Sequence, residues 1–107
     1  MYLGKDNRTD TKVVIKILQP VRASKILREI KILNELKGKE NIIQIHEFCS
    51  INKQKVKVII FEYVHETTLK EVAESLKDID IRNYMYQLLK ALDLCHSMGI
   101  IHRDVKP

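Results

Sequence analysis

The sequence predicts an α+β fold in which a β-rich first part, residues 1–62, is followed by an α-rich second part, residues 63–107. In the first part, runs of β-branched and apolar residues flank a single helical pattern. In the second part, apolar residues recur at the helical period. The 107 residues, 45% hydrophobic and 31% charged, suit one small globular domain or part of a larger one.

The first elements expected are a strand and a helix. The strand spans Thr11–Leu18, where the run from Val13 onward is apolar on both faces and only Lys16 interrupts it. Ile26, Ile30, Leu33 and Leu36 then follow at steps of four and three. This spacing predicts an amphipathic helix over about residues 21–36, with Gly38 at its C-cap.

Two further strand patterns cover residues 43–51 and 55–63, and the polar turn 52–54 between them predicts an antiparallel hairpin. Beyond the hairpin the pattern becomes helical. Thr68 and Glu71 have the spacing of a capping box for a helix that runs to about Leu76. Asp80 can cap a longer helix that ends before Gly99.

The net charge of +5 is concentrated in one stretch, residues 16–39. Such a patch suits an acidic partner, which includes nucleic acid, an acidic peptide and a phosphorylated peptide, and the plain alternative is a solvated helix face. No apolar run approaches the ~20 residues of a membrane span, so no membrane association is expected. Cys49 and Cys95 lie far apart in the sequence, which favours free buried thiols in a reducing compartment over a zinc site or a disulfide.

Lys16 is the first candidate for chemistry. Its ammonium lies on an apolar strand between Ile15 and Ile17, so it needs a counter-charge or a path to solvent. Glu29, on the next helix, can supply that charge. The alternative is a lysine on an edge strand whose alkyl stem reaches water.

The second candidate is the segment His102–Pro107, of sequence HRDVKP, which follows a helix and the apolar pair Ile100 and Ile101. It matches the start of the catalytic loop of protein kinases. In that chemistry Asp104 accepts the proton of a substrate hydroxyl, and Lys106 neutralises charge on the phosphoryl group that is transferred. The alternative is a polar loop with an unrelated aspartate.

The chain therefore resembles eukaryotic protein kinases, and most closely the casein kinase II catalytic (alpha) subunit, along its whole length. The segments that carry the resemblance are VVIKILQP at 13–20, REIKIL at 28–33, NII at 41–43, Phe61 with Glu62, DIRNYM at 80–85 and KALDLCHSMGIIHRDVKP at 90–107. The resemblance implies a bilobal kinase fold. The small lobe is partial, and the large lobe extends only to the catalytic loop.

The resemblance also assigns site residues. Lys16 would hold the α- and β-phosphates of ATP with Glu29 as its partner. The adenine site would comprise Val14, Ile43, Phe61 and the main chains of Glu62 and Val64. For the apolar members, plain core packing is the alternative. Leu33, Ile45 and His102 resemble members of the apolar column that couples the two lobes. Arg22, Lys25 and Arg28 would bind acidic substrates, although Ala23 and Ser24 reduce the charge of that stretch.

The implied function is a serine/threonine kinase that transfers the ATP γ-phosphoryl group to acidic protein substrates in the cytoplasm and nucleus. The glycine-rich phosphate loop is absent and the Mg²⁺ ligands lie beyond the chain end, so we expect a fragment that is inactive alone. The alternative is a non-catalytic module that binds a regulatory beta subunit through Tyr2, Ile15, Ile17, Cys49 and Ile60. A basic nucleic-acid-binding domain is the least supported hypothesis, because no helix-turn-helix, zinc or RNP pattern accompanies the charge.

Overall fold

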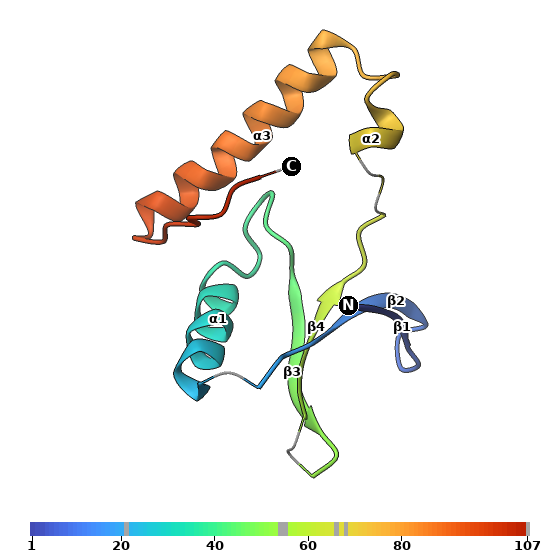
Figure 1. The fold of residues 1–107 in the computed structure, drawn as a ribbon, viewed down its shortest axis with the longest axis vertical. Coiled ribbons are helices and arrows are strands. Elements are labelled where there is room, and N and C mark those ends of the chain that lie inside the picture. Colours follow the sequence, from blue (N-terminus) through green and yellow to red (C-terminus); the bar gives the residue numbers. More distant parts are fainter. Residues whose placement is uncertain (21, 54–55, 66, 68, 107) are drawn as a thin grey trace. The chain divides into compact units, whose positions relative to one another are not determined.

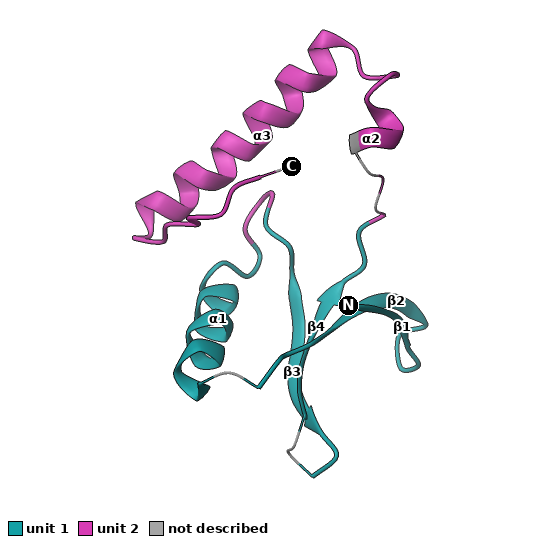
Figure 2. Ribbon diagram, viewed as in Figure 1, with its two compact units in different colours: residues 1–38, 42–64 teal, residues 39–41, 65–107 magenta. Residues whose placement is uncertain are grey.

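The computed structural model describes residues 1–20, 22–53, 56–65, 67 and 69–106 (Figure 1). Its elements are β1 (Tyr2–Asp6), β2 (Thr11–Ile17), α1 (Ala23–Glu35), β3 (Ile45–Ile51), β4 (Val56–Glu62), α2 (Leu69–Val72) and α3 (Asp78–Ser97). They form two compact units, shown in Figure 2. Residues 1–38 and 42–64 make the first unit, and residues 39–41 and 65–107 make the second. The α+β class is confirmed.

The first unit is built on one antiparallel sheet of four strands in the order β1-β2-β4-β3. The predicted hairpin is present as β3 and β4. Because β2 and β4 are the two inner strands, most of their side chains need apolar surroundings. This position explains the two-sided apolar pattern of both segments.

The core of the first unit lies between one face of the sheet and α1. Ile45, Ile59 and Phe61 form its buried cluster. Half-buried apolar side chains from the strands and from α1 pack against it, namely Val14, Leu18, Ile30, Leu33 and Phe48. The cross-strand pairs Val14↔Phe61 and Lys16↔Ile59 show that Lys16 lies on this inner, α1-facing side of the sheet.

The ends of α1 differ from the prediction. The helix begins at Ala23, and the predicted start at Val21 lies outside the described residues. Its C-cap is Leu36 and not Gly38. Leu36 is buried, so its side chain fixes the end of the helix, while Gly38 lies two residues later at φ +78 and turns the chain away.

The hairpin strands are shorter than predicted. β3 begins at Ile45 instead of Ile43, and β4 ends at Glu62 instead of Tyr63. Just ahead of β3, the N–H of Gln44 donates to the side-chain Oε1 of Glu62 at 2.8 Å. The register also shifts between Ile45 and Glu47. The predicted strand start at Lys55 lies outside the described residues.

In the second unit α2 ends at Val72 and does not reach Leu76. Both the backbone N–H and the hydroxyl of Ser75 donate to the carbonyl oxygen of Val72, at 2.9 Å each, which closes a turn in place of further helix. Thr68, the predicted cap, lies outside the described residues. α3 begins at Asp78 rather than at Asp80. Asp80 is three residues inside the N-cap Lys77, whose N–H donates to its carboxylate at 3.0 Å.

Cys49 and Cys95 are both free thiols; Cys95 is buried, whereas Cys49 is only half-buried and not buried as expected. Lys39–Asn41 belong to the second unit because polar contacts join them to α3. The side-chain amide of Asn41 donates to Oε1 of Gln87 at 2.7 Å, and Lys90 pairs with Glu40 at 3.2 Å. Within the part of the chain that the model describes, no helix is both long enough and apolar enough to cross a membrane.

We expect Ile59→Ala to lower the free energy of unfolding by about 2–5 kcal/mol, because Ile59 is fully buried in the core cluster and the substitution leaves a cavity. The milder Ile59→Val should cost about 0.5–1.5 kcal/mol and keep the protein folded. Ile51→Ala is the control, since Ile51 is 44% exposed on the same sheet. Equal losses for Ile59→Ala and Ile51→Ala in denaturant titrations would show that the core lies elsewhere.

Candidate functional site

The best-defined polar contact of the first unit joins β2 to α1. Lys16 Nζ lies 2.5 Å from Glu29 Oε1. Lys16 faces α1 because it pairs with the core residue Ile59 across the sheet. Glu29 immediately precedes Ile30, which packs against that core. The edge-strand interpretation of Lys16 is wrong, because β2 lies between β1 and β4 and its lysine is held by a carboxylate.

This ion pair is only half shielded, since each side chain is 38% exposed. A pair so close to solvent contributes only about 0–1 kcal/mol to stability. Its main effect is geometric, because it holds an ammonium at a fixed place beside the helix. A hollow of about 310 Å³ adjoins the pair and is lined by Lys16, Ile17, Leu18, Gln19, Lys25, Ile26 and Glu29.

The residues predicted to hold adenine fall into two groups. Val14 and Phe61 are cross-strand partners on the inner face, and both contribute to the core. Ile43 and Val64 are exposed and lie outside the strands. Glu62 ends β4 and is half-buried. The structure therefore brings Val14 and Phe61 together, and the adenine-binding role of all five residues stays a prediction.

Sequence reasoning missed one polar network next to Glu62. Its centre is Gln44, which lies just before β3 and contacts Gly38, Ile42 and Glu62 through hydrogen bonds. The only signal in the sequence is a glutamine in the otherwise apolar run 42–45. Such a signal identifies a polar residue that needs partners but does not identify those partners.

The predicted substrate-binding residues lie at the N-cap and in the first two turns of α1. Arg22 is the N-cap residue and makes no capping hydrogen bond with its side chain. Arg22, Lys25 and Arg28 are all exposed, and the first turn of α1 contains no acidic residue. Their guanidinium and ammonium groups are thus open to solvent in this part of the helix. Of the predicted apolar column, Leu33 packs against Ile45, whereas His102 belongs to the second unit.

The catalytic-loop segment is held by local contacts. The backbone N–H of Asp104 donates to Nδ1 of His102 at 3.2 Å, and Lys106 Nζ lies 3.2 Å from Asp104 Oδ2. Arg103 takes a left-handed conformation, at φ +65. The structure thus brings Asp104 and Lys106 together in an exposed loop. A carboxylate in this setting can accept a proton, and an ammonium beside it can approach an anionic group. Pro107 lies outside the described residues.

A magnesium ion needs several oxygen ligands. Among the described residues no group of three or more His, Cys, Asp or Glu side chains could hold a metal ion. Asp104 is paired with a lysine and does not form such a set by itself. The described residues therefore do not fit a metal, and we derive no step through one.

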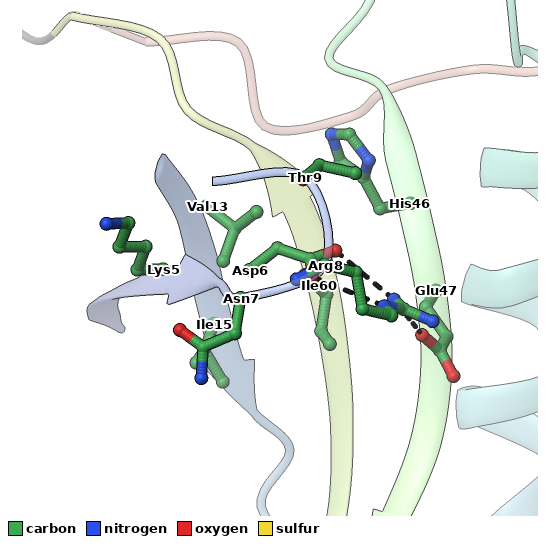
Figure 3. A pocket seen from close by; sticks show the side chains of 10 residues that line it. All are labelled: Lys5, Asp6, Asn7, Arg8, Thr9, Val13, Ile15, His46, Glu47 and Ile60. Carbon is green, nitrogen blue, oxygen red and sulfur yellow. Dashed lines mark hydrogen bonds and ion pairs between the residues drawn. The ribbon is translucent and has the colours of Figure 1, made fainter. Parts of the chain in front are cut away.

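A hollow of about 730 Å³ lies on the outer face of the sheet (Figure 3). Val13, Ile15 and Ile60 supply its apolar lining, and the turn after β1 borders it. Arg8 in that turn lies 3.2 Å from Asp6 and 3.5 Å from Glu47 on β3. Hydrogen bonding to Arg8 holds the pKa of Asp6 below its ordinary value, so the carboxylate stays charged to a lower pH than a free aspartate does.

Comparison with known protein families agrees with this arrangement. A family model described as "Protein kinase domain" matches residues 1–107, which is the whole chain. The four-stranded antiparallel sheet followed by helices is consistent with the N-terminal part of the kinase fold. Members of this family transfer phosphoryl groups and generally use ATP and Mg²⁺. The chain belongs to the protein kinase domain family.

Proposed function

We propose that the protein is a serine/threonine kinase of the casein kinase II alpha type, which transfers the γ-phosphoryl group of ATP to Ser or Thr in acidic proteins. The ATP-binding part of this proposal is supported by the Lys16–Glu29 ion pair at 2.5 Å. It is also supported by the membership of the chain in the kinase family. The lysine two residues after Asp104 supports serine/threonine specificity. The casein kinase II resemblance supports the substrate class and a location in the cytoplasm and nucleus.

In this mechanism Lys16 binds the α- and β-phosphates of ATP while Glu29 fixes its position. Asp104 accepts the proton of the substrate hydroxyl. The hydroxyl oxygen then forms a bond to the γ-phosphorus, the bond to the β,γ-bridging oxygen breaks, and ADP leaves. Lys106 lies beside Asp104 and can neutralise charge on the transferred group.

The acidic substrate preference is proposed from α1. Its N-cap and first two turns present Arg22, Lys25 and Arg28 to solvent, with no acidic residue in the first turn to neutralise them. Carboxylates and phosphates of a substrate would be attracted to this charge, and salt would weaken the attraction. The free thiols Cys49 and Cys95 agree with a reducing compartment.

Lys16→Met in the full-length gene product should lower kcat/KM for peptide phosphorylation by about 10²-fold or more, because the ammonium that holds the ATP phosphates is lost. The fold should survive, since methionine suits the apolar strand and the half-exposed pair adds little stability. Kinase assays and thermal melts of both proteins measure the two effects.

Lys31→Met is the matched control, because Lys31 is an exposed lysine on α1, two residues beyond Glu29. It should retain activity within about twofold of the parent. Activity of Lys16→Met within threefold of the parent would remove Lys16 from the ATP site.

Lys25→Glu should raise the KM for an acidic Ser/Thr peptide by about three- to tenfold, because it reverses an exposed charge on α1. The KM for a peptide whose acidic residues are replaced by amides should not change. Lys53→Glu makes the same charge change in the β3–β4 turn and should leave both KM values unchanged. If both variants respond alike, the effect is one of net charge and not of a substrate site on α1.

A second candidate function is a non-catalytic module that binds a regulatory beta subunit. The outer face of the sheet favours it. The register pairs Tyr2 with Ile15, Ile15 with Ile60, and Val58 with both Ile17 and Cys49, so these apolar side chains share one face. The helix α1 packs on the opposite face. Within the described residues of the first unit, this outer face therefore carries apolar side chains that no helix covers.

Ile17→Glu should weaken binding to a casein kinase II beta subunit at least tenfold, because it places a charge in this apolar face, while leaving the fold intact, since Ile17 is itself exposed. Leu27→Glu is the control, because Leu27 is an exposed apolar residue on α1. Titration calorimetry measures both. Failure of the parent protein to bind would rule out the module function.

A further inference from the structure

Gln44 forms hydrogen bonds to Gly38, Ile42 and Glu62 and has no role in the chemistry described so far. It lies between the exposed Ile43 and the buried Ile45, just before β3, and is itself half-buried. Both its side chain and its main chain take part in hydrogen bonds to residues from different elements. A polar side chain in an apolar segment must have its donors and acceptors satisfied, so these bonds fix its position.

The side chain of Gln44 is tied to the segment that follows α1. Its Oε1 accepts the backbone N–H of Gly38 at 2.5 Å, and its Nε2 donates to the carbonyl oxygen of Ile42 at 2.7 Å. Gly38 lies three residues after the last residue of α1. One amide side chain thus connects the end of the helix that carries Glu29 to the entrance of β3.

The main chain of Gln44 is tied to the end of β4. Its N–H donates to Oε1 of Glu62 at 2.8 Å, and its carbonyl oxygen accepts the N–H of Glu62 at 2.9 Å. Glu62 is therefore held through both its side chain and its backbone. Gln44 lies between Gly38 on one side and Glu62 on the other, and all three belong to the first unit.

The helix α1 needs such a connection because its packing is shallow. None of its residues is buried, and it contacts the core through half-buried side chains such as Ile30 and Leu33. The Lys16–Glu29 pair holds its middle, and the buried Leu36 holds its C-terminal end. Fixing Gly38 to Gln44 adds a directional contact that apolar packing does not provide.

We propose that Gln44 is a positioning residue for the nucleotide, which couples the end of α1 to the main chain of Glu62. The proposal rests on the proposed kinase function, in which the backbone of Glu62 binds adenine and Glu29 fixes the phosphate-binding lysine. A glutamine fits this role because its amide offers an acceptor to Gly38 and a donor to Ile42 at once. Leucine offers neither, and glutamate keeps only the acceptor.

The test compares Gln44→Leu and Gln44→Glu with the parent in the full-length gene product. For Gln44→Leu we expect the KM for ATP to rise about five- to tenfold, the scale of one or two lost hydrogen bonds. The kcat and the KM for peptide should stay within twofold. The KM for ATP of Gln44→Glu should lie at least halfway back from the Gln44→Leu value to the parent value on a logarithmic scale, because glutamate keeps the bond to Gly38. Asn83→Leu, which removes an exposed amide of α3 outside the network, should match the parent.

Hydrogen exchange of the Gly38 amide gives a readout that does not depend on activity. Exchange should be faster in Gln44→Leu and near the parent rate in Gln44→Glu. An unchanged KM for ATP in Gln44→Leu would overturn the proposal. So would a parallel change in kcat and both KM values with a lowered melting temperature, which indicates a purely structural role. If the parent transfers no phosphoryl group, the proposed function fails and this proposal fails with it.

Discussion

The contact between Lys16 and Glu29 is the constraint on which the rest of the first unit depends. An ammonium on the inner face of an apolar sheet requires a carboxylate at one place on the covering helix, so the pair determines how α1 is rotated and where it lies along β2. The apolar contacts of α1 are compatible with that rotation because Ile30 and Leu33 lie on the same side of the helix as Glu29. Since the pair is half exposed, it adds little to the free energy of unfolding. Its main effect is to favour this orientation of α1 over others.

Much of the fold could be predicted because strands, helices and their order follow from local apolar patterns. The residues at which helices and strands begin and end were harder to predict from the sequence. The helix after residue 68 is shorter than its pattern suggests because Ser75 bonds to the carbonyl of Val72, and β3 starts at Ile45, two residues later than its apolar pattern suggests. Lys16 and Glu29 could be paired from the sequence because a charge in an apolar strand demands a partner. The bonds of Gln44 to Gly38 and Glu62 could not be predicted, because they involve backbone groups that carry no sequence signal.

The two faces of the sheet differ in what covers them and in the residues they carry. The inner face packs against α1 around Ile59, and it carries Lys16. The outer face retains apolar side chains beside charged ones, with Arg8 bonded to carboxylates on β1 and β3. A partner that covers this face must either keep those ion pairs or replace them, because an unpaired charge in a dry interface is costly. Apolar contact alone is therefore insufficient for a tight complex there.

The Lys16–Glu29 pair of the first unit and the Lys106–Asp104 pair of the second differ in their exposure to water. The side chains of Lys16 and Glu29 are each 38% exposed, whereas those of Lys106 and Asp104 are 69% and 72% exposed. Charges interact more strongly where water is partly excluded. A phosphate that approaches Lys16 gains more from that ammonium than one that approaches Lys106 in open solvent. Under the proposed kinase function, ATP affinity would depend mainly on the first unit, and Asp104 and Lys106 would become effective only when bound reactants displace the water around them.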